Sequence, residues 1–114
     1  MTPKKGEIWI ANLNPTRGSE QAGIRPVVIF QNDLINRYTT TILAIPLTTN
    51  LKRAALPSCL MIPKGEGGLN RDSVALCHQF RVLNKKRLDK KLGMLHSQTI
   101  EALEACMLFT LGII

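Results

Sequence analysis

Short apolar runs, separated by turn-forming residues, occupy the first half of this chain. Runs of this kind are typical of β-strands a few residues long. They predict strands over residues 7–13, 26–31, 40–47 and 58–62. The strand over 26–31 is apolar on both faces, so we expect it to be covered on both sides. Pro46 has no backbone N–H to donate, which puts the strand over 40–47 at a sheet edge or gives it a bulge near its end.

Residues 73–83 can form one long strand or two short ones. In an unbroken strand, successive side chains point to opposite faces. This alternation predicts that Cys77, Gln79 and Arg81 share a face suited to hydrogen bonding, whereas His78 points inward beside Phe80. An inward imidazole is an ordinary core or interface histidine.

Helical patterns are brief until the end of the chain. We expect a helical turn over 33–38, a flexible turn over 64–68 and a short helix in the basic stretch 85–91. The last helix starts at Ser97, a suitable N-cap, and Glu101 falls in its first turn. One face of this helix carries Ile100, Leu103, Met107, Leu108 and Leu111.

Five short strands and one terminal amphipathic helix predict a mostly β fold with minor α content. The expected architecture is a small, mostly antiparallel barrel with the helix packed against it. A chain of 114 residues is long enough for one core, so we expect a single domain over residues 1–114.

The charge of the chain indicates which classes of partner it can bind. Its 15 lysines and arginines exceed its 8 acidic residues, which gives a net charge of +7. The excess is spread over both halves of the chain and favours a polyanionic partner, either nucleic acid or an acidic protein segment. Basicity alone also suits a ribosomal or a membrane-surface protein.

The cysteines and the apolar runs of the sequence indicate the cellular compartment and whether the chain binds a metal. Cys59, Cys77 and Cys106 form no CxxC pair and leave one thiol over, which suits a reducing cytoplasm. No apolar run reaches membrane-spanning length, and residues 1–5 lack the pattern of a signal peptide. No spacing of His, Cys, Asp and Glu resembles a metal site, so we expect neither a metal nor another cofactor.

A polar, glycine-bounded loop holds the most distinctive candidate residue. Gly18 and Gly23 let this loop fold back tightly, and Pro26 pushes Arg25 into extended geometry. A guanidinium on such a stiff base can bind one phosphate in one orientation, through two oxygens at once. The alternative is a surface ion pair between Arg25 and Glu20.

An ordered set of motifs links this loop to a known family. After the run Gly18-Ser19-Glu20-Gln21-Ala22-Gly23-Ile24-Arg25-Pro26 come an apolar strand and Gln31-Asn32-Asp33. The matching segments elsewhere are Gly6-Glu7-Ile8-Trp9, Pro46-Leu47-Thr48, Arg71-Asp72-Ser73-Val74 and Gln79-Phe80-Arg81. Over nearly its whole length, the chain resembles the MazF/PemK family of toxin endoribonucleases. The resemblance implies an SH3-like barrel of the kind shared with CcdB-like gyrase poisons, usually as a homodimer.

The resemblance also implies roles for two residues. Arg25 would supply positive charge to the scissile phosphate, and Thr48 would pair with it as a second catalytic residue. From the residues alone, a threonine at the end of a strand more often bonds its own backbone, so that alternative stays open.

Other residues of the motifs are candidates for contacts with RNA. These are Arg17, Ser19, Glu20, Gln21, Gln79 and Arg81. The family pattern has an acid where this chain has His78, so a catalytic carboxylate is missing at that position. An imidazole near an RNA site is the usual proton shuttle, which makes His78 a candidate for proton transfer.

Three functions follow from these observations. The first is a metal-independent, sequence-specific endoribonuclease, the toxin of a type II toxin–antitoxin system. It would cleave single-stranded mRNA by attack of the 2′-hydroxyl and leave a 2′,3′-cyclic phosphate (or 3′-phosphate) and a 5′-hydroxyl. Its partner would be an acidic antitoxin of the MazE/PemI type. The alternatives are a non-catalytic barrel that poisons a protein target such as DNA gyrase, and a non-catalytic RNA-binding barrel.

Overall fold

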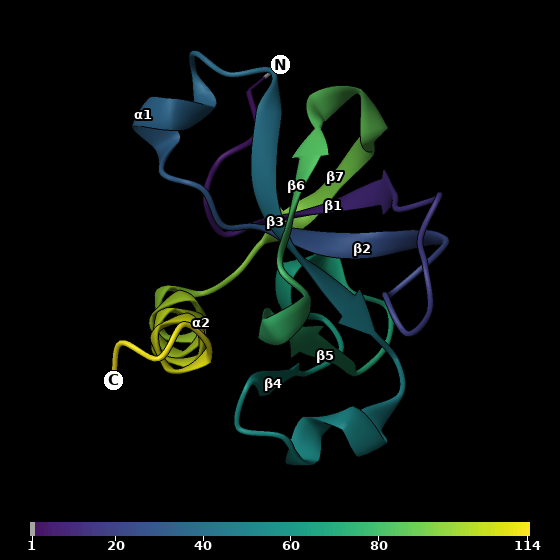
Figure 1. Cartoon of the computed structure of the whole chain (residues 1–114), viewed down its shortest axis with the longest axis vertical. Coiled ribbons are helices and arrows are strands. Elements are labelled where there is room, and N and C mark those ends of the chain that lie inside the picture. Colours follow the sequence, from purple (N-terminus) through teal and green to yellow (C-terminus); the bar gives the residue numbers. More distant parts are fainter. Residues whose placement is uncertain (1) are drawn as a thin grey trace.

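A computed structural model describes residues 2–114 (Figure 1). This part of the chain forms strands β1 (Glu7–Asn12), β2 (Ile24–Ile29), β3 (Thr41–Thr48), β4 (Cys59–Ile62), β5 (Ser73–Leu76), β6 (Arg81–Asn84) and β7 (Leu88–Met94). Its α-helices are α1 (Asp33–Asn36) and α2 (Ser97–Thr110). Short 3-10 turns link the strands: η1 (Leu51–Ala55), η2 (Glu66–Gly68), η3 (Cys77–Gln79) and η4 (Lys85–Arg87).

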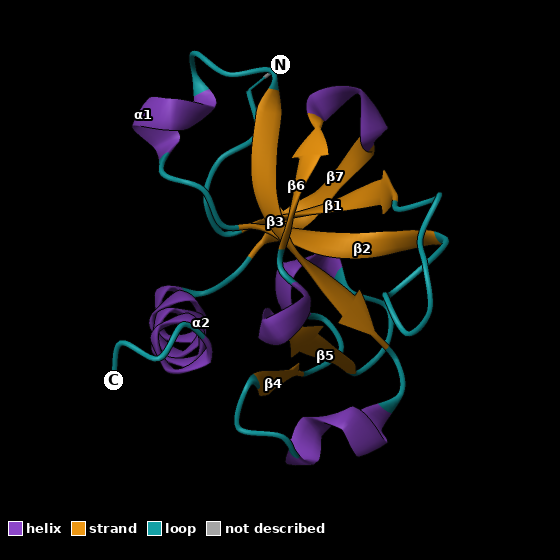
Figure 2. Cartoon of the chain, viewed as in Figure 1, coloured by secondary structure: helices purple, strands orange, loops and turns teal. Residues whose placement is uncertain are grey.

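The strands form one bent antiparallel sheet with α2 beside it (Figure 2). The order of pairing is β4-β5-β3-β2-β1-β7, and β6 pairs with β3 off this path. The end strands β4 and β7 do not pair with each other among the described residues, so the barrel is open. The predicted fold class, mostly β with a C-terminal helix, is confirmed.

Strand β3 lies at the centre of the sheet, which makes the edge position predicted from Pro46 wrong. One side of β3 pairs with β2, and Pro46 lies opposite Val27 there. The other side pairs first with β6, through residues 41–44, and then with β5, through Leu47 and Thr48. Pro46 lies where this side changes partner, so its missing N–H interrupts neither ladder.

Strand β7 differs from the expectation, since the basic residues of this stretch predicted a helix. Only Lys85–Arg87 forms a helical turn, and Lys90 and Lys91 belong to a strand paired with β1. The two leucines of this strand, Leu88 and Leu92, are four residues apart, which fits a helix as well as a strand. The pairing with β1 is irregular, with shifts in register, and therefore leaves no clean alternation in the sequence.

Two apolar clusters lie on opposite faces of β2. Val28 packs with Ile8, Ile45 and residues of α2, whereas Val27 and Ile29 pack with Trp9 and other residues of a second cluster. The predicted covering of this strand on both sides is confirmed.

A buried carboxylate ties β7 to β1. Glu7 is 5% exposed, and its Oε2 lies 2.8 Å from Lys91 Nζ. Its Oε1 accepts hydrogen bonds from Trp9 Nε1 at 3.0 Å and from the backbone N–H of Lys4 at 2.8 Å. Burial raises the pKa of Glu7, but these three donors outweigh it and leave the pKa below its ordinary value.

The turn predicted over 64–68 packs against β7 at Gly67 and Gly68. Gly67 and Gly68 have positive φ angles of 61° and 78° and lie against β7. A Cβ on Gly93 of β7 would come within 2.6 Å of the backbone carbon of Gly67. The two backbones meet more closely than any side chain permits, so glycine is required on the strand as well as in the turn.

Helix α2 starts at Ser97 but has His96 as its N-cap residue, without a side-chain cap, and Glu101 lies beyond its first turn. Leu103 and Met107 are buried, whereas Leu108 and Leu111 are exposed. The predicted apolar face is therefore only half covered, because the helix packs on η3 and β4 along a narrow stripe.

Candidate active site

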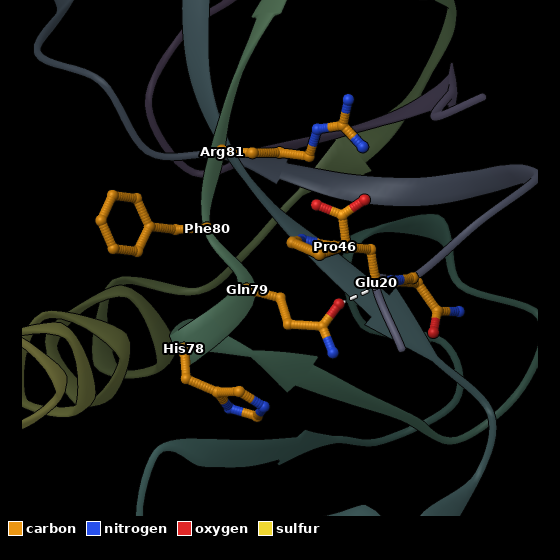
Figure 3. A pocket seen from close by; sticks show the side chains of 7 residues that line it. Glu20, Pro46, His78, Gln79, Phe80 and Arg81 are labelled. Atoms are coloured by element: carbon orange, nitrogen blue, oxygen red, sulfur yellow. Dashed lines mark hydrogen bonds between the residues drawn. The ribbon is translucent and has the colours of Figure 1, made fainter. Parts of the chain in front are cut away.

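A pocket of about 310 Å³ lies between the loop that joins β1 to β2 and the segment from η3 into β6 (Figure 3). The β1–β2 loop covers residues 13–23. The pocket is lined by Glu20, Gln21, Pro46, His78, Gln79, Phe80 and Arg81. It brings together five candidates from the sequence, Glu20, Gln21, His78, Gln79 and Arg81, and Arg17, Ser19, Arg25 and Thr48 do not line it.

Gln79 holds the β1–β2 loop in place. Its Oε1 accepts a hydrogen bond from the backbone N–H of Gln21 at 2.6 Å. Its Nε2 donates to the carbonyl of Ser19 at 3.2 Å. Both ends of the amide are thus used on the loop, and Gln79 shapes the pocket wall.

Two arginines fix the base of the same loop. Arg81 Nη1 donates to the carbonyl of Leu13 at 3.1 Å, and Arg87 Nη1 donates to the carbonyl of Asn12 at 3.1 Å and to that of Asn14. The Asn14 side chain accepts from the N–H of Gly23 at 3.1 Å and closes the loop. These roles of Arg87 and Asn14 leave no sign in the sequence, because a bond to a backbone group requires no partner side chain.

Arg25 lies inside β2, opposite Ala11, because the strand begins at Ile24 rather than after the arginine. Its side chain is half-buried, and its Nε donates to the carbonyl of Ala22 at 3.1 Å. Among the described residues Arg25 forms no ion pair with Glu20. Glu20 instead accepts a hydrogen bond from the backbone N–H of Arg17. The surface ion pair considered as the alternative is therefore absent from this part of the chain.

Thr48 is the last residue of β3 and is 8% exposed. Its Oγ1 accepts a hydrogen bond from the backbone N–H of Asn50 at 3.2 Å, as expected of a threonine at a strand end. The pairing of β2 with β3 stops at Val27 and Pro46, and Arg25 and Thr48 each lie two residues past this end of it. Arg25 pairs with Ala11 of β1 and Thr48 with Val74 of β5, so the two candidates lie on different strand pairs near the same end of the β2–β3 pairing.

His78 is exposed, and its predicted inward orientation is wrong. The long-strand alternative for 73–83 fails because η3 separates β5 from β6, and a tight turn abolishes the alternation of side chains. The side chains of His78 and Gln79 extend to the same side, with Phe80 on the other (Figure 3). Ser58 Oγ lies 3.0 Å from His78 Nδ1.

The buried thiols of Cys59 and Cys77 are poor nucleophiles in this environment. Burial raises the pKa of Cys77 to about 12 and also raises the pKa of Cys59.

No group of three His, Cys, Asp or Glu side chains in residues 2–114 is arranged to hold a metal ion. No helix within the same residues is both long and apolar enough to span a membrane.

The fold and the site together define a class of small, basic β proteins with a polar pocket between a β-hairpin loop and the sheet. The family model described as "PemK-like, MazF-like toxin of type II toxin-antitoxin system" matches residues 4–110. The chain therefore belongs to the PemK/MazF family of toxins.

Individual relatives agree with this assignment. The chain is 38% identical to the endoribonuclease MazF of Staphylococcus epidermidis over 110 residues, which covers 96% of this chain and 92% of the relative. The fold is similar to a crystal structure of MazF from Deinococcus radiodurans, with a TM-score of 0.85, 24% identity and 98% of each chain covered. It is also similar to a mycobacterial endoribonuclease in complex with its cognate antitoxin, with a TM-score of 0.82, 22% identity and coverage of 98% and 97%.

Proposed function

We propose that this chain is a metal-independent, sequence-specific endoribonuclease that cleaves single-stranded mRNA as the toxin of a type II toxin–antitoxin system. The observation that supports the proposal is the match of residues 4–110 to this toxin family, in a chain where Arg25 and Thr48 both lie past the same end of the β2–β3 pairing. The relative in Staphylococcus epidermidis, named an endoribonuclease, supports the same activity here.

The reaction proposed is an attack of the ribose 2′-oxygen on the adjacent phosphorus. A 2′-oxygen–phosphorus bond forms, the bond from phosphorus to the 5′-oxygen breaks, and the products end in a 2′,3′-cyclic phosphate and a 5′-hydroxyl. Arg25 binds two oxygens of the phosphate and stabilises the charge that develops there. The Thr48 hydroxyl orients the attacking 2′-oxygen.

The pocket is proposed to bind bases next to the cleaved bond. Its carboxylate, guanidinium and imidazole offer both acceptors and donors to the edges of unstacked bases, as expected of an enzyme for single strands. Glu20 and Arg81 face the pocket from its two sides, and Arg17 and Ser19 extend the polar surface along the loop. Gln79 acts here by holding the loop.

The test is cleavage of a long RNA in excess EDTA, with the 5′ ends mapped by primer extension. We expect cuts at one short sequence motif, and new 5′ ends that a kinase labels without prior phosphatase treatment. Arg25→Ala should abolish the cuts, and Arg37→Ala, which removes an exposed arginine at the end of α1, should keep them. Intact RNA, or cuts that survive Arg25→Ala, would contradict the proposal.

The partners proposed follow from charge and family. A net charge of +7 attracts both an acidic antitoxin of the MazE/PemI type and the phosphate backbone of RNA. The mycobacterial structure similar to this chain is a complex of an endoribonuclease with its antitoxin. We further propose that the toxin is a homodimer of single-domain subunits, each comprising residues 1–114, and that it acts in the cytoplasm.

A further inference from the structure

The geometry points to Ser58 as a positioning residue that holds the His78 imidazole so that His78 protonates the 5′-oxygen that leaves during RNA cleavage. This inference depends on the proposed endoribonuclease function and adds a proton donor to it. Ser58 precedes β4 and belongs to none of the motifs that link the chain to its family.

Ser58 is joined to the η3 turn by two independent contacts. Its carbonyl accepts a hydrogen bond from the backbone N–H of Cys77 at 3.0 Å. Its Oγ lies 3.0 Å from His78 Nδ1, whereas the Sγ of Cys59 is 3.9 Å from the same nitrogen. The backbone contact sets the distance between the two residues, and the hydroxyl then fixes the rotation of the ring.

A ring held through Nδ1 presents Nε2 in another direction, away from Ser58. His78 lines the pocket, and its ring extends to the same side as the Gln79 amide (Figure 3). When the imidazole is charged, both nitrogens carry hydrogen, so Nδ1 donates to Ser58 and Nε2 can donate to a ligand. Ser58 thereby leaves Nε2 as the ring nitrogen that can donate a proton into the pocket.

The location of His78 favours the leaving oxygen over the attacking one. Arg25 and Thr48 lie on β2 and β3 and do not line the pocket, whereas His78 lies on the η3 turn and does line it. Displacement at phosphorus needs the attacking and leaving oxygens in line on opposite sides of the phosphorus. With Thr48 assigned to the attacking oxygen, His78, which comes from a different element, is assigned to the leaving oxygen.

The protons balance in this scheme. As the 2′-oxygen bonds to phosphorus, its proton passes to water, and the Nε2 proton passes to the 5′-oxygen as that oxygen leaves. His78 then regains a proton from water. The charged or titratable groups around the ring are Cys59 on β4, the preceding residue Cys77, and Glu20 and Arg81, which also line the pocket, with Arg53 of η1 acting on Cys59.

A double-mutant cycle tests whether Ser58 acts through His78. We expect His78→Ala to lower kcat for RNA cleavage about 100-fold, and Ser58→Ala to lower it about 5-fold with KM unchanged. In the His78→Ala background, Ser58→Ala should have no further effect. With His78 present, Ser58→Thr, which keeps the hydroxyl, should retain the activity of the wild type. A 5-fold loss that persists without His78 would overturn the inference.

A modified substrate tests the proton transfer itself. An RNA with sulfur in place of the 5′-oxygen at the cleaved bond releases a thiolate, which leaves without a proton. On this substrate His78→Ala and Ser58→Ala should cleave as fast as the wild type. An undiminished defect would show that His78 does not protonate the leaving group. Absence of cleavage by the wild type on ordinary RNA would instead refute the proposed function.

Discussion

The buried carboxylate of Glu7 and the pocket residues are two polar regions that differ in how their hydrogen-bonding groups are used. Glu7 is 5% exposed and receives three donors, from Lys91, Trp9 and the backbone of Lys4. His78, by contrast, is exposed and uses Nδ1 on Ser58, while its ring lines an open pocket. A buried charge whose hydrogen-bonding positions are all occupied stabilises the fold. An exposed group that still has a free donor or acceptor can bind a ligand.

The comparison separates two effects of mutation that are often confused. Changes at the Glu7 cluster should lower the free energy of unfolding and leave cleavage by the folded protein intact. Changes at Arg25, at Thr48 or at the pocket should do the reverse. The variants at Arg25 and Glu7 are therefore followed by both urea unfolding and RNA cleavage.

The largest effect is expected from Arg25→Ala. Loss of the guanidinium that binds the phosphate should lower kcat/KM about 1000-fold, in the range seen when a preorganised group for transition-state charge is removed. The free energy of unfolding should change by less than about 0.5 kcal/mol, because the one hydrogen bond lost is to the carbonyl of an exposed residue, Ala22. A large loss of stability in urea would erase the distinction between the two regions.

Glu7→Gln should lower the free energy of unfolding by about 2 kcal/mol. The substitution removes the negative charge that pairs with Lys91 and that accepts hydrogen bonds from Trp9 and from the backbone of Lys4. The matched control is Glu101→Gln, an exposed glutamate on α2, for which we expect no measurable change. Cleavage by the folded fraction of both variants should equal that of the wild type. A cleavage defect in Glu7→Gln would place this cluster in the functional site.

Gly93→Ala should cost about 1–3 kcal/mol of stability, because its Cβ would overlap the backbone of Gly67. Gly65→Ala is the comparison: Gly65 has a φ of 96°, but a Cβ added there would meet nothing within 4 Å. Its cost should be about 1 kcal/mol, from backbone strain alone. Equal losses for the two variants, measured by urea unfolding, would show that the strand and the turn can separate without penalty.

Gln79→Ala should lower cleavage about 10-fold by releasing the β1–β2 loop, since both of its amide bonds go to that loop. Hydrogen exchange at the backbone N–H of Gln21 should become faster, and Gln98→Ala on α2 should change neither measurement. Slower cleavage with unchanged exchange at Gln21 would instead indicate that Gln79 contacts RNA directly.

The smallest effect is a dependence of stability on pH. The pKa of Glu7 is below its ordinary value of 4.5, so the folded protein binds fewer protons than the unfolded chain in this range. Its stabilising contribution is complete above pH 4.5 and decreases as the pH falls through the folded pKa. The difference in unfolding free energy between the wild type and Glu7→Gln should therefore shrink in acid. A constant difference would mean that the carboxylate is not shifted.

Strands with continuous apolar runs could be predicted from the sequence to within about two residues, as for β1 and β4. The failures lie where tertiary contacts override the local pattern. Strand β7 forms because β1 offers it an edge and Glu7 offers Lys91 a partner, and neither is visible in the residues of β7 themselves. The edge position predicted from Pro46 failed for the same reason, since only the topology shows that β3 changes partner beside it.

The candidate site was predictable in part. The motifs identified Glu20, Gln21, Gln79 and Arg81, and the structure gathers them around one pocket. The motifs could not show that the Gln79 amide forms hydrogen bonds to the backbone of the β1–β2 loop, because these bonds depend on the path of that backbone. Ser58 is 20 residues from His78 and carries no signal in the sequence, since its role arises only when β4 is laid beside the η3 turn.

The buried thiols of Cys59 and Cys77 offer a built-in reporter of unfolding. With pKa values raised by burial, to about 12 for Cys77, these sulfurs carry almost no thiolate at neutral pH and resist alkylating reagents while the protein is folded. Their modification requires the chain to open first. The rate at which iodoacetamide labels these two cysteines therefore reports on unfolding of the protein, without any added dye or tag.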